Sequence, residues 1–477
     1  MNVYFPDKHS HASTVWGAMP PSPFGTAWLM YMLSVAWVWT GGTTASEVAG
    51  QAAALTGFGL IGLVVIELRR SWRNIFRADT MALAALYFLT LFEFLLPQDK
   101  INSLSTADSI LNGSHLCFTA FAALALGRHI TLPTSRQLLL LVHRPVPTTL
   151  IVRVFWIAMG CGYFYMLFSV GFNPVAFIGE MFEPRFARAW GRGRFGGWST
   201  FLIELQLFLY LIPPLGGAIL ARSSRYSFGQ LFSVAAGVAI TLFQGFSSGT
   251  RNVFGAYLLT FLVGYAFALP SSKRKRAIVA SGIGAVLMII ATRVMLQFRQ
   301  MGLGRYLESG PSVLSSPEGK AIHVDYNLYV ISELMPVFPE HVGFLGWEVP
   351  FWALVKPIPR ALWPGKPDGL STGIEESLGA EGLTLATTYI GEAYMSGGWL
   401  AVILFSLLFG ALARWWNQCG SSQTSDLGVL IYASGFFAFA ISMRSLFWTT
   451  TAMLPTIAII VIGRYLVRQV YQRSIPA

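Results

Sequence analysis

The chain has 477 residues, of which 54% are hydrophobic and only 12% are charged, and its mean hydropathy is +0.57. The charged fraction is about half of that in an ordinary soluble domain, which excludes a disordered chain, a fibrous repeat and a multidomain soluble enzyme. The net charge of +11 would suit nucleic acid. In a membrane protein, however, such an excess more often reflects basic cytoplasmic loops, so we expect membrane lipids and no nucleic acid as partners.

Apolar stretches of about 20 residues, the length with which an α-helix crosses a bilayer, recur along the chain. They predict an all-α polytopic membrane protein with about 12 transmembrane helices. The predicted spans are 24–41, 47–67, 80–97, 110–127, 150–172, 199–221, 229–246, 252–269, 277–296, 398–414, 427–443 and 446–467. Pro213 and Pro214 must interrupt the sixth span, because proline lacks an amide hydrogen and clashes with the preceding turn.

The spans divide the chain into five parts. These are a cytoplasmic N-terminal segment (1–23), transmembrane helices 1–9 (24–296), a large periplasmic loop (297–397), transmembrane helices 10–12 (398–467) and a cytoplasmic tail (468–477). With the N-terminus inside, most of the 33 Lys and Arg lie on the inner side, as the positive-inside rule requires. The sequence therefore predicts a multi-pass protein of the bacterial inner membrane with both termini cytoplasmic, and the first 23 residues do not resemble a cleavable signal peptide.

The long loop carries half of the chain's 22 acidic residues together with many aromatic residues. A loop of about 100 residues with this composition is expected to be folded, and loops of that length are usually functional. Its middle is apolar and is predicted to lie on the outer leaflet or to dip into it. The apolar residues are Trp347, Phe351, Trp352, Leu354 and Trp363.

Several basic residues fall on the predicted outer side, against the usual translocation bias. They are Arg185, Arg188, Arg192, Arg194, Arg251, Arg293, Arg299, Arg305, Arg360, Lys366 and Arg444. Guanidinium groups bind phosphate through paired hydrogen bonds, so arginines that converge from different helices would suit a pyrophosphate. Each one could instead pair with a lipid headgroup or a nearby acid, and the group from Arg185 to Arg194 best fits headgroup contact.

Three residues are candidates for proton transfer. Glu392 precedes the tenth span, although a carboxylate there could instead serve the helix dipole. His323 and Asp325 could be a base and its orienting partner, or two ordinary surface residues. The spacing of His and Cys predicts no metal site, and no motif predicts a cofactor.

Four stretches together resemble the oligosaccharide repeat-unit polymerases of bacterial surface polysaccharide synthesis, the Wzy-type or O-antigen polymerase group. They are SSGTRN (247–252), DYNLYVISELMP (325–336), PIPRALWPGKP (357–367) and TTYIGEAYMSGGWLAVILFSLLFGAL (387–412). The resemblance is firm over 325–412, fair around 247–305 and only topological over the first 230 residues. The PRALWPGKP string is its most specific part.

The resemblance implies a membrane glycosyltransferase of the GT-C-like architecture that O-antigen polymerases and ligases are thought to share. Such an enzyme takes undecaprenyl-pyrophosphate-linked oligosaccharides at the periplasmic face and transfers the growing glycan from its lipid carrier to the next unit. It would use no nucleotide sugar, metal or other cofactor. A chain-length regulator and a flippase would be its candidate protein partners.

On this basis we assign residues to two roles. Acceptor activation is assigned to Glu392, with Asp325 and His323 as competing candidates. Binding of pyrophosphate and substrate is assigned to Arg251, Arg293, Arg299, Arg360, Lys366, Tyr394 and Arg444. Three other functions stay open: an O-antigen ligase, which transfers the same kind of donor to another acceptor, a lipid-linked oligosaccharide flippase, and a structural scaffold for a polysaccharide assembly complex, which would leave the arginines unexplained.

Overall fold

The protein is all-helical in the computed structural model, which describes residues 20–96, 98–143, 146–191, 199–309, 326–358, 362–367, 369–379, 385–420 and 425–472. No strand occurs within these ranges. The helices are α1 (Pro23–Trp39), α2 (Ala45–Arg70), η1 (Trp72–Phe76), α3 (Ala78–Thr90), η2 (Phe92–Leu95), η3 (Asp99–Ser103), α4 (Ala107–Gly127), α5 (Arg136–His143), α6 (Thr148–Ser169), α7 (Pro174–Glu180), α8 (Ser199–Glu204), η4 (Leu205–Leu211), α9 (Ile212–Ala221), η5 (Ser223–Arg225), α10 (Phe228–Ser247), α11 (Arg251–Ala268), η6 (Ser271–Lys273), α12 (Arg274–Met301), α13 (Leu303–Ser309), α14 (Asn327–Val337), α15 (Glu348–Val355), α16 (Ile374–Ser377), α17 (Thr388–Asn417), α18 (Asp426–Ser442) and α19 (Leu446–Gln472), where η marks a 3-10 helix.

Each predicted span lies on a helix or a run of helices. Within the described ranges, seven helical segments are long and apolar enough to cross a membrane, and α3 and α18 are shorter apolar helices. The seven are Ala45–Arg70, Ala107–Gly127, Thr148–Ser169, Leu202–Ala221, Phe228–Ser247, Thr388–Asn417 and Leu446–Tyr465. The fold is therefore that of an all-helical protein built like a polytopic membrane protein, whereas twelve spans and the GT-C-like architecture stay predictions.

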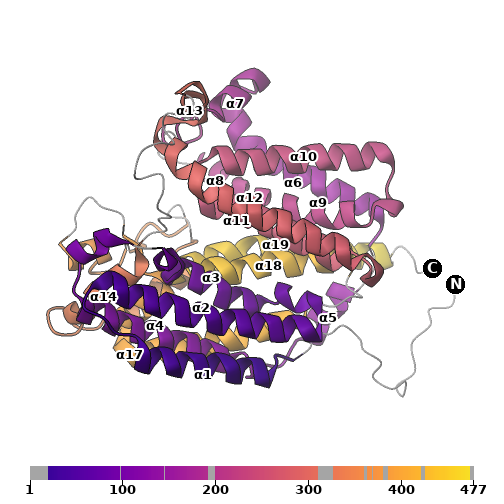
Figure 1. Cartoon of the computed structure of the whole chain (residues 1–477). Helices are drawn as coiled ribbons and strands as arrows, with labels where there is room; N and C mark the ends of the chain where they lie inside the picture. The colour runs from indigo at the N-terminus through magenta and orange to yellow at the C-terminus, as the bar shows by residue number, and fades with distance from the viewer. Residues whose placement is uncertain are drawn as a thin grey trace, which may run out of the picture.

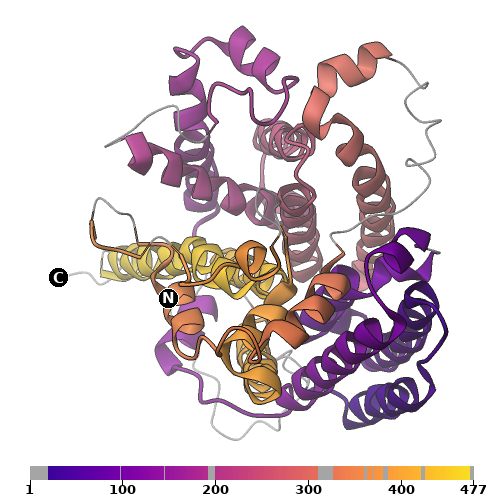
Figure 2. The same cartoon turned by 90° about the vertical axis from the view of Figure 1, so that its left-hand side faces the viewer.

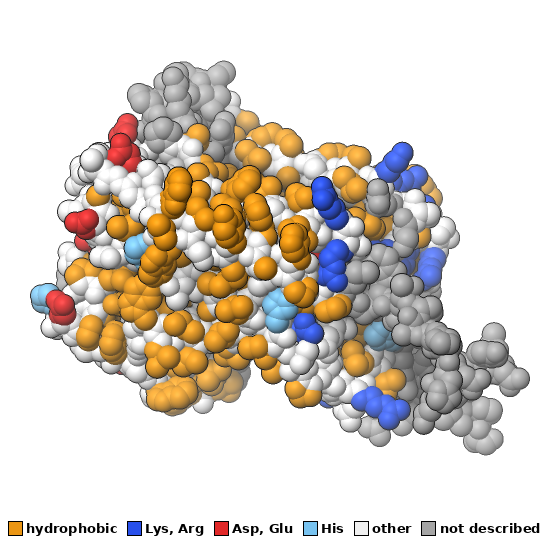
Figure 3. Space-filling model, turned by 60° about the horizontal axis from the view of Figure 1, so that its bottom comes forward, with side chains coloured by type: hydrophobic (Ala, Val, Ile, Leu, Met, Phe, Trp, Pro, Cys, Tyr) orange, Lys and Arg blue, Asp and Glu red, His pale blue; other side chains and the backbone are white. Residues whose placement is uncertain are grey.

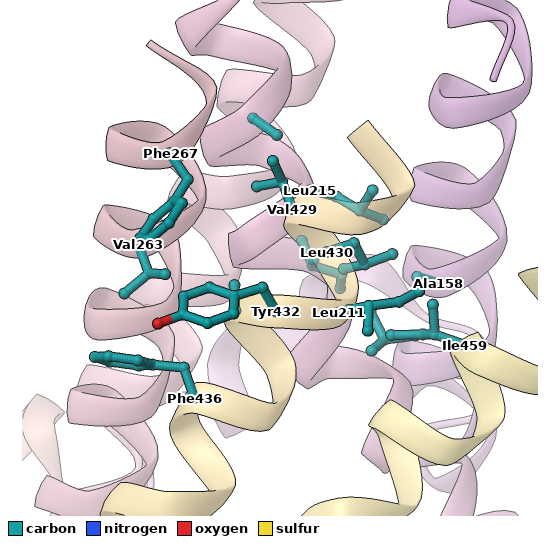
Figure 4. Packing of buried hydrophobic residues seen from close by; sticks show 14 of the residues in the cluster. Ala158, Leu211, Leu215, Val263, Phe267, Val429, Leu430, Tyr432, Phe436 and Ile459 are labelled. Atoms are coloured by element: carbon teal, nitrogen blue, oxygen red, sulfur yellow. The ribbon is translucent and has the colours of Figure 1, made fainter. Parts of the chain in front are cut away.

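The helices pack around two large apolar cores. One core joins α1–α4 with α14 and α17, and the other joins α6, α9, α10, α11, α18 and α19. α18 lies between them, packed against α3 and α17 on one side and against α9 and α11 on the other (Figure 1). Figure 4 shows part of the second core, where Tyr432 and Phe436 of α18 meet Val263 and Phe267 of α11. The Phe267 and Tyr432 rings are 4.7 Å apart.

The bundle has two ends, which we call the α14 end and the α5 end after the helices that mark them in Figure 1. Figure 3 shows one face of the molecule, on which hydrophobic side chains cover the middle, acidic side chains lie toward the α14 end and Lys and Arg toward the α5 end. An apolar belt with polar ends is the surface that a bilayer requires. By the positive-inside rule the basic α5 end would face the cytoplasm, and this orientation stays a prediction.

Local sequence explains where several helices begin and break. α2 begins with a capping box, in which the Thr44 hydroxyl accepts from the Glu47 amide and the Glu47 carboxylate accepts from the Thr44 amide. The predicted sixth span is interrupted: residues 205–211 form the 3-10 helix η4, and Pro213 and Pro214 fall in the first turn of α9. Proline is tolerated there because first-turn amides have no partner within the helix.

The described part of the long loop is folded, and the helices on either side extend further into the predicted loop than expected. α12 continues to Met301, and α17 begins at Thr388, ten residues before the predicted tenth span. Between them, α14 packs against α4 and α17 and belongs to the first core. Figure 2 looks onto this end, where the orange segments lie across the ends of the bundle helices.

Candidate functional site

The first part of α17, residues 388–396, is a short buried half-helix that bears most of the YIGEAYMSGGW stretch. It begins at Thr388, whose φ is +57°, a left-handed conformation that is costly for a β-branched residue. It ends at Gly397 and Gly398, where the helix breaks and Gly398 takes φ +64°. Backbone strain of this kind clusters at functional sites, which marks the half-helix as a candidate.

The break in α17 is closed by a segment of the long loop. The amides of Leu345 and Gly346 donate to the carbonyl oxygens of Met395 (2.8 Å) and Ser396 (2.9 Å). A side chain at Gly398 would lie 3.0 Å from the Phe344 ring, so glycine is needed for the approach as well as for the backbone angle. The loop thus donates hydrogen bonds to two carbonyl oxygens that the break leaves without partners in the helix.

Glu392, in the half-helix of α17, is 4% exposed, and its carboxylate lies against the start of α19. One carboxylate oxygen accepts from the Ser445 hydroxyl and the other from the Leu446 amide, both at 2.5 Å. A carboxylate is favoured at this position because the N-terminus of a helix carries partial positive charge. Glu392 therefore fixes the turn between α18 and α19 and, with it, Arg444. Its predicted role as a base stays a prediction.

Lys356, which follows α15, lies on the same turn. Its ammonium group is 4.9 Å from the centre of the Trp448 ring and 5.6 Å from that of Phe447, and its charge acts on Glu392. The Thr450 hydroxyl, in the first turns of α19, donates to the carbonyl oxygen of Ala353. α15 is thereby attached to α19 beside the buried carboxylate.

Lys366, predicted to bind substrate, lies with Lys356. Its ammonium group donates to the carbonyl oxygens of Lys356 (2.6 Å) and Ile358 (2.9 Å) and lies 5.1 Å from the Trp352 ring. The neighbouring surface of α15 is apolar and open, with Trp347 85% and Leu354 65% exposed. Lys356 and Lys366 therefore adjoin the exposed apolar surface of α15. An anionic lipid needs such a combination of positive charge and apolar surface.

Arg251 and Arg299, the other predicted phosphate ligands, belong to two chain segments that lie against each other at the α14 end. Arg251 is the first residue of α11, and Arg299 lies in the last turn of α12. Between α10 and α11, Gly249 has φ +63°, and a side chain there would come within 2.9 Å of the Arg299 Cα. Because α11 and α18 pack against each other and run in opposite directions, Arg251 and Arg444 lie at the same end of the bundle.

The DYNLYVISELMP stretch anchors α14 to the first core. Tyr326 has φ +49°, and its hydroxyl donates to the Gln98 side chain at 3.2 Å. The Asn327 amide donates to the carbonyl oxygen of Leu89 at 2.7 Å. Burial and the charge of Glu93 raise the pKa of Tyr326. These contacts hold the start of α14 in place. The proton-transfer role of Asp325, the residue before Tyr326, stays a prediction.

Of the other predicted site residues, some lie outside the described residues and two, Arg293 and Tyr394, lie within them. His323, Asp325 and Arg360 lie outside the described residues. Arg293 lies within α12. Tyr394 is buried, with its hydroxyl 3.3 Å from the carbonyl oxygen of Phe338, so it packs the half-helix onto the loop. Among the described residues, no group of three or more His, Cys, Asp and Glu could hold a metal ion.

Sequence reasoning missed a buried charge network at the α5 end. Arg77 pairs with Asp79 at 2.9 Å, and Arg128 pairs with both Asp79 and Glu67. Asn417, at the end of α17, donates to the Asp79 carboxylate at 2.7 Å. The pairing of acids with arginines at neighbouring span ends is the signal that could have revealed it.

The headgroup interpretation is wrong for Arg188, which is 2% exposed. It lies within the described part of the Arg185–Arg194 group, against protein carbonyl oxygens. Its spacing from the neighbouring arginines gave no sign of this, because burial there depends on a contact with α10, far away in the sequence.

Comparisons with known proteins name no relative: no family model, no curated protein and no solved structure matches the chain.

Proposed function

We propose that this protein is a membrane glycosyltransferase that polymerises undecaprenyl-pyrophosphate-linked oligosaccharide units at the α14 end. The observation that carries the proposal is the place of the predicted basic residues. Lys366 and Arg444 lie with Lys356 around the start of α19. Arg251 begins α11, and the turn that precedes it lies against the backbone of Arg299. The apolar face of α15 adjoins the first of these groups. A pyrophosphate on a long isoprenoid chain presents an anion and an apolar tail side by side, which matches this surface.

The chemistry needs charge stabilisation more than acid catalysis. The acceptor sugar hydroxyl attacks the anomeric carbon of the donor, the bond from that carbon to the pyrophosphate oxygen breaks, and the lipid pyrophosphate leaves with the bonding electrons. Preorganised positive charge on that leaving group is typically the largest catalytic contribution. The basic residues at the α14 end, Arg251 foremost, would supply it.

The acceptor proton must pass to a base, which typically contributes about 10²–10⁴-fold. Glu392 would have to exchange its hydrogen bond with Ser445 for one with the acceptor hydroxyl. Asp325 and His323 are the alternative bases. We therefore propose that Glu392 orients the α18–α19 turn in the resting enzyme, and we keep all three residues as candidates for the base.

An in vitro assay tests the proposal directly. Purified protein in nanodiscs receives a lipid-pyrophosphate-linked repeat unit, without nucleotide sugar and with EDTA, and the product is resolved on a gel. We expect a ladder with repeat-unit spacing, and we expect Arg251→Ala to lose about 10²-fold in rate. Arg69→Ala, an exposed change at the α5 end, is the matched control. Transfer to an added lipid A core without a ladder would make the protein a ligase.

A transporter is the second candidate, and the break in α17 is the observation that favours it. Discontinuous helices form the substrate sites of many transporters. In this protein the half-helix is buried and closed by the loop, at one end of the bundle instead of its middle. Flipping of the lipid-linked unit in proteoliposomes, with no ladder in the nanodisc assay, would favour the transporter.

A further inference from the structure

Arg188 is among the most buried charged residues of the α14 end, although it lies in the connection between α7 and α8. Its guanidinium donates to the carbonyl oxygens of Met181 (2.8 Å) and Glu183 (3.2 Å) and to the carbonyl oxygen of Ser247. The Trp190 ring lies beneath it at 5.9 Å. Among the described residues Arg188 forms no ion pair within 4.0 Å: its hydrogen bonds go to neutral carbonyl oxygens, and the carboxylates of Glu180 and Glu183 act on it from further away.

The acceptor Ser247 explains how this charge is tolerated. Ser247 is the last residue of α10, where carbonyl oxygens lack partners within the helix and the helix dipole is negative. A cation is favoured at such a terminus. Burial nevertheless lowers the pKa of Arg188 to about 10, which shows that desolvation outweighs the nearby carboxylates. The contact is therefore specific: the arginine caps the C-terminus of α10.

The same connection also contacts the end of α12. The Gly304 amide donates to the carbonyl oxygen of Phe182 at 3.0 Å. Gly302 has φ +87°, and a side chain there would meet the Phe182 oxygen at 2.8 Å. Residues 181–191 thus touch the end of α10 through Arg188 and the end of α12 through Phe182. They bridge the two elements that lead to Arg251 and to Arg299.

The turn between α10 and α11 joins Ser247, which Arg188 contacts, to Arg251 four residues later. Ser248 accepts from the Thr250 amide at 3.2 Å, and the Thr250 hydroxyl donates back to the Ser248 carbonyl oxygen at 3.3 Å. Gly249 lies directly against the Arg299 backbone. A shift of the α10 terminus would therefore move Arg251 relative to Arg299.

We infer that Arg188 is a positioning residue, which holds the α10–α11 turn against the end of α12 and so sets the separation of Arg251 and Arg299. It binds no substrate itself. The inference rests on the proposed function only where it says what the two arginines are for, namely to bind a pyrophosphate.

Hydrogen exchange tests whether Arg188 holds the α10–α11 turn, and the measurement needs no enzymatic activity. Amides of residues 248–254 should exchange at least about tenfold faster in Arg188→Ala than in the unchanged protein, because the turn loses its brace. Arg188→Lys should give an intermediate rate, since one ammonium cannot reach three carbonyl oxygens in a fork. Arg185→Ala is the matched control and should leave these rates unchanged. Equal exchange in Arg188→Lys and Arg185→Ala would overturn the inference, even if Arg188→Ala failed to fold.

Binding of undecaprenyl pyrophosphate to protein in nanodiscs tests the other half. We expect Arg188→Lys to weaken binding by about tenfold and Arg185→Ala by less than about twofold. If Arg251→Ala weakens binding and Arg188→Lys does not, the positioning role is overturned. If neither variant weakens binding although exchange is faster in Arg188→Lys, the turn is braced as inferred and the pyrophosphate assignment of the proposed function fails.

Discussion

The two ends of the bundle hold their basic side chains in different ways. At the α5 end, Arg77 and Arg128 pair with Asp79 and Glu67, and Arg222 pairs with Asp426. At the α14 end, Arg188 and Lys366 donate hydrogen bonds to carbonyl oxygens, and Lys356 lies over aromatic rings while its charge also acts on Glu392. Direct arginine–carboxylate pairs thus mark the first end, and hydrogen bonds to carbonyl oxygens and contacts with aromatic rings mark the second.

This difference separates architecture from candidate chemistry. An ion pair among buried residues fixes helix ends relative to one another and has no charge left for a ligand. Basic side chains gathered at one end of the bundle contribute a positive field, which attracts an anion. Under the proposed function we therefore expect the α5 end to stabilise the fold and the α14 end to bind the anionic substrate, and each expectation can be tested separately.

Arg128→Met should have the largest effect, on stability. The change removes the buried arginine partner of Glu67, which keeps only the partly exposed Arg70 as an ion-pair partner, and one of the two arginine partners of Asp79. Breaking a buried pair by removing one member typically costs about 3–5 kcal/mol. Thermal unfolding of the detergent-solubilised protein should show a large fall in Tm.

Arg69→Met is the control for that measurement, because Arg69 is exposed in the same turn as Glu67. The double variant Glu67→Gln with Arg128→Met should regain part of the loss, since it removes both charges of one pair. Equal Tm values for Arg128→Met and Arg69→Met would mean that the network does not stabilise the fold. The proposed difference between the two ends would then be wrong.

Glu392→Gln asks whether the buried carboxylate of the α14 end is structural as well. Glutamine keeps one acceptor and turns an amide N–H₂ toward one of the two donors, Ser445 or Leu446, which should cost about 1–3 kcal/mol. If Glu392 orients the turn, Tm and polymerisation rate fall together. A rate loss of about 10²–10⁴-fold at unchanged Tm would make it the base. Glu340→Gln, an exposed change in the same long loop, is the control.

Much of the fold could be predicted from the sequence, because an apolar helix is recognisable from its own residues without knowledge of its tertiary contacts. The predicted spans fall on helices, and the break before Pro213 was predicted because proline disrupts the chain locally. The start of α17 was missed, because the half-helix from Thr388 depends on contacts with Met443 and with residues 345–346. No window of neighbouring residues contains that information.

The candidate site was predictable only as a set of residue types. Sequence placed Arg251, Arg299 and Arg444 at one end, because their places follow from helix direction. It gave no warning that Arg188 would be buried while Arg185 would not, since both stand in the same arginine-rich stretch. Which arginine faces a helix terminus is decided by the path of the connecting loop, and that path is set by tertiary contacts.

The last prediction concerns the difference between two glycines with the same backbone angle. Gly249 and Gly171 both have φ +63°, so alanine should cost about 1–2 kcal/mol at either position. Only at Gly249 would the new side chain meet the Arg299 backbone, at 2.9 Å, whereas nothing lies within 4 Å at Gly171. Gly249→Ala should therefore lose about 1–3 kcal/mol more and should slow polymerisation, because Arg251 and Arg299 are forced apart. Tm and the rate of ladder formation measure both effects. Equal losses in the two variants would show that the close approach at Gly249 does not matter, and the pairing of those arginines would lose its geometric support.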